Sequence, residues 1–128
     1  MSVVLDASAV ICLLHDEPGA DQVRGELDGA RISAVNWTEV LQKVVHAGDP
    51  GIAGDLEPWA AAVGLSVSNF TVDDARVAAR LWAPTRELGL SLGDRACLAL
   101  AERLAMPVLT ADRVWAGLSV ASEIRVIR

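Results

Sequence analysis

The sequence alternates short apolar runs with longer segments whose apolar residues recur at helical spacing. The apolar runs predict strands within residues 2–5, 28–35, 65–70, 108–110 and 124–127. The helical patterns cover residues 7–14, the stretch up to about residue 27, and residues 36–48, 52–64, 71–82, 91–105 and 111–118. Short strands that are apolar on both faces and alternate with helices are typical of a parallel sheet covered on both sides. We therefore predict one α/β domain over residues 1–128, with a short, mostly parallel central sheet.

Single residues mark several of the predicted helix ends. Gly48 is expected to end the helix over residues 36–48. Thr71 is expected to cap the helix over residues 71–82, and Pro84 to end or kink it. The chain contains no internal repeat, low-complexity segment or linker, which agrees with a single domain.

Composition narrows the class of protein. Hydrophobic residues make up 52% of the 128 residues, enough for a substantial core. No apolar run approaches the roughly 20 residues of a membrane span, and no basic segment precedes an apolar signal core. We therefore expect neither a membrane segment nor a secretory signal. Cys12 and Cys97 lie in apolar surroundings without metal-site spacing, so we expect buried free thiols and a cytoplasmic protein.

The net charge of −6 argues against nucleic-acid binding by bulk electrostatics, because attraction to phosphate needs a positive surface. Ten of the eleven basic residues are arginines, and Lys43 is the only lysine. Arginines can still form a local phosphate-binding patch, and bound divalent cations would add positive charge.

Four acids occupy comparable places in the predicted elements. Asp6 ends the first strand, Glu39 lies in the first turn of the helix after the second strand, Asp94 begins a helix, and Asp112 follows the strand over residues 108–110. Each has a simple explanation alone, since acids are favoured as helix caps and near helix N-termini. Asn36 with Glu39, and Ser91 with Asp94, have the spacing of capping boxes.

Taken together, the four acids predict a metal site. In an open parallel sheet the carboxyl ends of the strands lie along one edge, where ligands bind. Carboxylates about 4 Å apart repel by roughly 4 kcal/mol at a surface-like dielectric. Lys43 is one turn after Glu39, on the side away from the helix start, so we do not expect it to compensate the four charges. A hard divalent cation with oxygen ligands, Mg²⁺ or Mn²⁺, is the natural compensation.

Polar neighbours of the acids are candidates for substrate contacts. Ser8 and Thr110 each lie two residues from an acid, where local backbone bonding is an equally good explanation. Arg95 and Arg113 directly follow acids, so each is either a phosphate contact or half of a surface ion pair. Asn36 is expected to be a helix cap. The chain has no glycine-flanked serine elbow and no glycine-rich phosphate loop.

Four segments carry a resemblance to a known family. They are "VVLDASAVICLL", "ISAVNWTEVLQKV", "GLSLGDRACLALA" and "VLTADRVW", and they span residues 3–115 in order. In these segments the chain resembles the PIN-domain ribonucleases, in particular the VapC-type toxins of bacterial toxin–antitoxin pairs. One departure from the family pattern is Pro84, which interrupts what is commonly a longer helix.

The resemblance implies a three-layer α/β/α sandwich and a Mg²⁺- or Mn²⁺-dependent endoribonuclease. It assigns the family's acidic quartet, as catalytic residues and metal ligands, to Asp6, Glu39, Asp94 and Asp112. It further implies a VapB-type antitoxin that blocks the acidic crevice, and homodimerisation.

Two other readings of the acids stay open. One is a binding module whose acids cap helices and attract a basic peptide. The other is a phosphoryl-transfer or receiver-like domain, although such sites usually place a lysine late in the chain. Neither the RNA that is cut nor the number of metal ions follows from the sequence.

Overall fold

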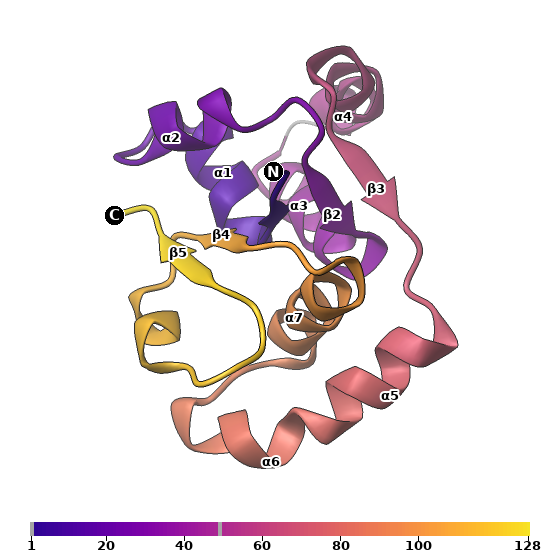
Figure 1. The fold of residues 1–128 in the computed structure, drawn as a ribbon. Helices are drawn as coiled ribbons and strands as arrows, with labels where there is room; N and C mark the ends of the chain where they lie inside the picture. The colour runs from indigo at the N-terminus through magenta and orange to yellow at the C-terminus, as the bar shows by residue number, and fades with distance from the viewer. Residues whose placement is uncertain (1, 49) are drawn as a thin grey trace.

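The computed structural model, which describes residues 2–48 and 50–128, contains a five-stranded sheet (Figure 1). The strands are β1 (Val4–Leu5), β2 (Arg31–Ser33), β3 (Ser66–Ser68), β4 (Val108–Thr110) and β5 (Ile124–Val126). Their order is β3-β2-β1-β4-β5, and every neighbouring pair is parallel. The predicted parallel sheet is confirmed, and β1 lies at its centre.

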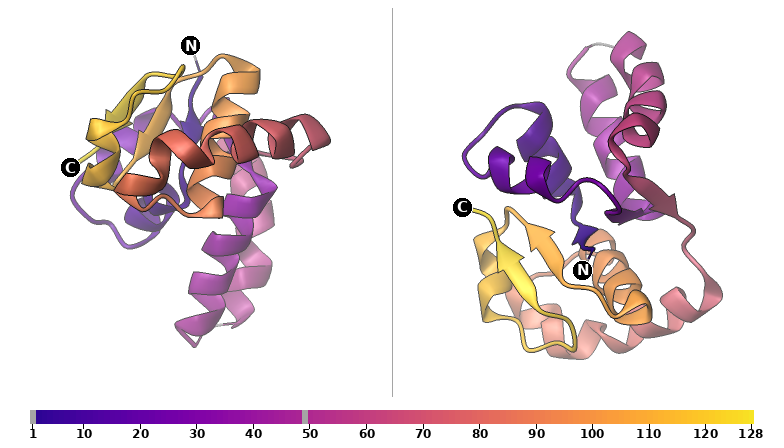
Figure 2. Two further views of the ribbon diagram at one scale, coloured as in Figure 1. Left: turned by 90° about the horizontal axis from the view of Figure 1, so that it is seen from below. Right: turned by 45° about the horizontal axis from the view of Figure 1, so that its top comes forward.

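Helices connect the strands and cover both faces of the sheet. They are α1 (Ala7–Leu14), α2 (Ala20–Gly25), α3 (Ala34–His46), α4 (Pro50–Val63), α5 (Val72–Arg80), α6 (Trp82–Thr85) and α7 (Leu92–Leu104), with short 3-10 helices η1 (Arg86–Leu88) and η2 (Arg113–Gly117). In Figure 2, α3 and α4 run side by side and extend together beyond the sheet. Among the described residues, no helix has both the length and the apolarity needed to cross a bilayer.

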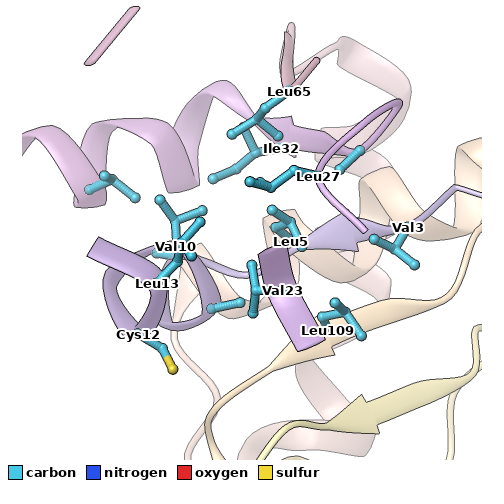
Figure 3. Close-up of a cluster of buried hydrophobic side chains, with 14 of the residues drawn as sticks. Val3, Leu5, Val10, Cys12, Leu13, Val23, Leu27, Ile32, Leu65 and Leu109 are labelled. Carbon is cyan, nitrogen blue, oxygen red and sulfur yellow. The ribbon is translucent and has the colours of Figure 1, made fainter. Parts of the chain in front are cut away.

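Both faces of the sheet are buried. The successive residues Val3, Val4 and Leu5 belong alternately to two hydrophobic cores, one on each face of the sheet. Val3 and Leu5 pack with side chains of α1, α2, α3 and α4 on one face (Figure 3). Val4 and Val108 pack with α7 and with Trp115 of η2 on the other face. Side chains alternate across a strand, so a strand with a core on each side must be apolar throughout. The result is the predicted three-layer α/β/α arrangement.

Both cysteines are free and buried, as expected from their apolar surroundings. Cys12 belongs to the core that α1 to α4 share, and Cys97 of α7 belongs to the core on the other face. Burial raises the pKa of the Cys97 thiol well above its usual value, which keeps it protonated and unreactive.

Two helices have boundaries that differ from the predicted ones. The helix that carries Glu39 begins at Ala34, because Ser33 at the end of β2 accepts a hydrogen bond from the Val35 N–H and caps it. Asn36 is therefore inside the helix, and its expected role as a cap is wrong. The helix capped by Thr71 ends at Arg80, and a separate short helix contains Pro84. Proline has no N–H for the carbonyl four residues earlier, so it interrupts the helix one turn before itself.

A buried ion pair joins α5 to α7. Asp74 is 1% exposed, and its carboxylate accepts hydrogen bonds from Arg103 Nε at 2.7 Å and Nη2 at 3.1 Å. Oδ2 also accepts a hydrogen bond from the Thr71 N–H at 3.1 Å, and the Asp74 N–H donates to Thr71 Oγ1, which completes a capping box. Burial favours a higher Asp74 pKa, but the hydrogen bonds from Arg103 and Thr71 and the Arg103 charge outweigh it, so the pKa is lowered. A lowered pKa means that this carboxylate stabilises the folded state when it is ionised.

Replacing Arg103 with methionine is expected to lower the free energy of unfolding at pH 7 by about 2–4 kcal/mol, because it leaves a buried carboxylate without its partner. The wild-type contribution is present above the unfolded aspartate pKa near 3.9 and is lost as pH falls through the lower folded pKa. The variant should therefore lose less stability than wild type on acidification. Urea denaturation between pH 3 and 7 measures both effects.

Arg76→Met is the matched control, since Arg76 pairs with Asp73 at the surface, where both side chains are more than two-thirds exposed. It should change the free energy of unfolding by less than about 0.5 kcal/mol. Equal losses in the two variants would contradict the importance assigned to the Asp74 pair.

Candidate active site

All four acids singled out in the sequence line one cavity of about 430 Å³. Asp6 directly follows β1, Asp112 follows the neighbouring strand β4, Glu39 lies on α3 after β2, and Asp94 lies in the first turn of α7. The cavity therefore lies at the carboxyl edge of the parallel sheet, where such folds bind ligands. The expected convergence of the four side chains on one crevice is what the structure shows.

Asp6 is the most deeply placed of the acids, at 5% exposure. Its Oδ2 accepts hydrogen bonds from Ser8 Oγ at 2.6 Å and from Thr110 Oγ1 at 3.0 Å. The Ser8 oxygen in turn accepts from the Ala111 N–H, and the Thr110 oxygen from the Asp112 N–H. Each hydroxyl thus accepts from the backbone and directs its one proton to Asp6. Within the described residues Oδ1 makes no hydrogen bond, so it is the oxygen left for a ligand.

The electrostatics of the cavity oppose an ionised Asp6. Burial is the main cause that raises the pKa of Asp6 to about 6, and the negative charges of Asp94 and Glu39 raise it further. The hydrogen bonds from Ser8 and Thr110 act in the opposite direction but do not cancel the effect. A carboxylate kept in such a place despite the cost needs a positively charged partner.

Glu39 is held against the start of α7 by Asn36. The fully buried Asn36 amide donates from Nδ2 to Glu39 Oε1 at 2.8 Å and to the Gly93 carbonyl at 2.9 Å. A Cβ atom on Gly93 would lie only 2.6 Å from Glu39 Oε1, so the carboxylate occupies the space that a side chain would need. Asn36 and Gly93 together fix Glu39 beside the turn that carries Asp94.

Asp94 and Asp112 both take part in helix capping as well as lining the cavity. Asp94 Oδ2 accepts from the Ser91 N–H at 2.9 Å, and Ser91 Oγ accepts from the Asp94 N–H, which completes a capping box. Asp112 Oδ1 accepts from the Val114 N–H at 3.0 Å. Each cap uses one carboxylate oxygen, so the capping explanation and a role in the cavity are compatible.

The two arginines predicted to contact phosphate are directed elsewhere. Arg95 Nη1 donates to the Ala78 carbonyl of α5 at 2.7 Å, and Arg113 Nε donates to the carbonyl of Arg128 at 3.0 Å. Neither residue lines the cavity that the described residues form. Successive helical residues point about 100° apart, so sequence adjacency to Asp94 did not bring Arg95 to the same site.

The positioning role of Asn36 was not predicted from the sequence, and Lys43 is closer to the site than its place in the sequence indicated. Lys43 lines the cavity with the acids, and so does His46 at the end of α3. Lys43 shares a helix face with Glu39 because residues four apart on a helix lie on one side, but among the described residues it forms no ion pair with the acids. The spacing between Glu39 and Lys43 was the available signal.

The donor set suits a hard divalent cation, although no three Asp, Glu, His or Cys side chains of the described chain form a ready-made metal cluster. Mg²⁺ usually keeps several waters and binds through one or two carboxylates. Asp6 offers a buried carboxylate with one unused oxygen, and three further carboxylates face the same cavity. Carboxylate oxygens are the ligands that Mg²⁺ and Mn²⁺ favour, so the residues present fit such an ion.

Both the sequence and the fold are similar to those of VapC proteins. The family model described as PIN domain matches residues 3–120. The Mycobacterium tuberculosis protein named ribonuclease VapC30 is 32% identical over 115 residues, which cover 84% of this chain and 87% of that protein. Among solved structures, the DNA-bound VapBC of Salmonella typhimurium superposes with a TM-score of 0.77 at 15% identity, covering 100% of this chain and 99% of its own. M. tuberculosis VapC20, described as a Sarcin-Ricin loop cleaving toxin, has a TM-score of 0.69 at 16% identity, with 94% and 99% coverage.

Proposed function

This chain belongs to the PIN-domain family, and we propose that it is a metal-dependent endoribonuclease and the toxin of a toxin–antitoxin pair. The observation that carries the proposal is the convergence of four carboxylates, from four separate parts of the chain, on one cavity at the carboxyl edge of the sheet. A relative named as a VapC ribonuclease, matched over most of both chains, supports RNA as the substrate.

The metal would be Mg²⁺ or Mn²⁺, held by Asp6, Glu39, Asp94 and Asp112 directly or through water. When bound, such an ion supplies a Lewis acid for the phosphate oxygens and an activated water as the nucleophile. No covalent intermediate with the protein is required.

The residues of the chain contribute position and charge. Ser8 and Thr110 orient Asp6 by donating to one oxygen and leaving the other free. Asn36 sets Glu39 against α7. Because these donors are already in place in the folded protein, the carboxylates need little reorganisation when a ligand enters. Ser8 and Thr110 are thus better described as positioning residues than as substrate contacts.

The partner we propose is a VapB-type antitoxin that blocks the acidic cavity. The structural neighbours include VapBC complexes, and the net charge of −6 favours a basic partner segment. We also propose a homodimer, which rests on the family resemblance.

The direct test is cleavage of total cellular RNA by the purified, antitoxin-free protein, with Mn²⁺ or Mg²⁺ compared with EDTA. Discrete metal-dependent fragments are expected, and primer extension would locate the cut bonds. Activity that is equal in EDTA would contradict metal dependence. No cleavage, combined with no effect of Mn²⁺ on thermal stability, would instead favour a binding module in which the acids only cap helices.

Gly93→Ala is expected to lower kcat/KM for RNA by about 10- to 100-fold, because the new methyl group would displace the Glu39 carboxylate. A misplaced metal ligand should also raise the Mn²⁺ concentration needed for half-maximal activity. Steady-state kinetics at several Mn²⁺ concentrations measures both quantities.

Gly54→Ala is the matched control for this substitution. Gly54 lies within α4, and a Cβ atom there would meet nothing within 4 Å. The variant should keep wild-type kinetics and gain up to about 1 kcal/mol of stability from better helix propensity. Wild-type kinetics in Gly93→Ala as well would show that the exact place of Glu39 is unimportant.

A further inference from the structure

We infer that Lys43 binds a phosphate of the RNA strand next to the one that is cleaved, so that α3 guides the strand into the acidic cavity. This inference rests on the proposed ribonuclease function and adds the residue that holds the substrate backbone.

The position of Lys43 follows from the face that α3 presents to the cavity. Glu39, Gln42, Lys43 and His46 all line it, at relative positions i, i+3, i+4 and i+7. These positions form one stripe along a helix. Lys43 lies one turn, about 6 Å along the axis, beyond Glu39. Because α3 continues beyond the sheet (Figure 2), this stripe leads outward from the four acids.

The charges of the chain single out Lys43. All ten arginines have partners within the protein. The partners are carboxylates for Arg24, Arg76, Arg80, Arg103, Arg125 and Arg128, neutral oxygens for Arg31, Arg95 and Arg113, and the Trp82 ring for Arg86.

Lys43 differs from every arginine in this respect. It is exposed, and within the part of the chain that the structure describes it makes no hydrogen bond or ion pair. No carboxylate of those residues lies within 4.0 Å of its ammonium group, although Glu39 is one turn away. It is therefore a cation of the cavity wall that a ligand can engage without breaking an existing contact.

The ligand must suit both the four acids and the positive charge of Lys43. A phosphodiester chain has a negative charge at every link, so one phosphate can lie at a metal ion among the acids while its neighbour meets Lys43. A basic peptide, such as the partner segment proposed above, would pair with the four acids but would leave Lys43 without a counter-charge. An acidic peptide would suit Lys43 but not the four carboxylates. RNA is the ligand class that fits both.

The test measures RNA affinity against salt concentration for wild type and Lys43→Met. The probe is a 5′-fluorescein-labelled single-stranded RNA of mixed sequence, followed by anisotropy with Ca²⁺ in place of Mn²⁺, and a gel verifies that it stays intact. One phosphate contact to a single strand contributes about 0.7 to the slope of log affinity against log salt. The variant should lose about that amount, which corresponds to a fivefold weaker affinity near 0.1 M KCl.

Kinetics provide a second readout, since a residue that binds the RNA backbone away from the cleaved bond should raise KM and leave kcat within about twofold. Lys43→Arg should restore both the salt slope and KM. Arg76→Met removes the same charge from an exposed site on α5, outside the residues that line the cavity, so it controls for net charge.

The outcomes separate the two hypotheses. A salt slope and KM in Lys43→Met equal to those in Arg76→Met would overturn the inference. So would a variant that binds RNA normally but has lost affinity for its antitoxin, because Lys43 would then contact the protein partner. If wild type neither binds nor cleaves RNA, the ribonuclease function itself fails.

Discussion

Asp6→Asn is expected to abolish RNA cleavage and, in EDTA at pH 7.5, to make the protein more stable than wild type. The loss of activity should be at least about 10³-fold, because a metal ion supplies several kcal/mol of transition-state stabilisation that depends on its ligands. The gain in stability follows from removing a buried charge that the metal-free fold does not neutralise.

The hydrogen bonds of Asp6 explain why the amide should be accommodated. Ser8 and Thr110 both donate to Oδ2, so an asparagine that places its carbonyl oxygen there keeps both bonds. Its amide group would then take the place of Oδ1, which makes no hydrogen bond within the described residues. The substitution therefore exchanges the metal-ligating oxygen for an NH₂ group and leaves the supporting contacts in place.

The size and the pH dependence of this gain follow from the Asp6 pKa. The rise of the Asp6 pKa from 3.8 to about 6 means that folding with Asp6 ionised costs roughly 3 kcal/mol of stability. Burying an amide offsets part of it, so we expect a net gain of about 1–2 kcal/mol, or a Tm about 3–8 °C higher. The contribution of Asp6 to wild-type stability is most favourable below pH 4 and falls as pH rises through 6. The advantage of the variant should therefore be absent at pH 4 and complete above pH 7.

Asp94→Asn tests whether the gain in stability is specific to the buried charge of Asp6. It should also abolish cleavage, but Asp94 is half-buried and its Oδ2 serves the capping box, so no comparable gain in stability is expected. Differential scanning calorimetry and an RNA cleavage assay on the same preparations give both readouts. An active Asp6→Asn protein would contradict the site assignment, and an inactive but less stable one would contradict the electrostatic argument.

The sheet and the meeting of the four acids were predictable because each depends on a local pattern and one general rule. Val3, Val4 and Leu5 are apolar in succession, as a strand with a core on each side requires. Once a parallel sheet is inferred, strand ends and the following helix N-termini must share an edge, which brings Asp6 and Asp112 together. The helix cap formed by Thr71 was also predictable, because it depends on a local sequence pattern.

Details of the site depend on how helices are rotated and where they begin, which the sequence leaves open. The spacing of Asn36 and Glu39 fits a capping box as well as an interior pair, and only the end of β2 at Ser33 decides between them. Arg95 follows Asp94 in sequence but faces α5, because neighbours on a helix point in different directions. Tertiary packing, rather than local preference, sets such orientations.

Mn²⁺ is expected to raise the Tm of wild type by about 6–12 °C when it is present at 100 times its dissociation constant. Binding to the folded state alone at that ratio contributes about 2.7 kcal/mol, and the relief of repulsion among Asp6, Glu39 and Asp94 is part of the affinity that sets the dissociation constant. Protons compete with the metal for Asp6, so the Tm shift should be smaller at pH 5, below the Asp6 pKa of about 6, than at pH 7.5.

Asp6→Asn should lose most of the Mn²⁺-dependent Tm shift at both pH values. Asp73→Asn, at an exposed acid paired with Arg76 on α5, should keep all of it. Equal shifts in the two variants would mean that Mn²⁺ binds the acidic surface in general, and the cavity would then have no special affinity for the ion.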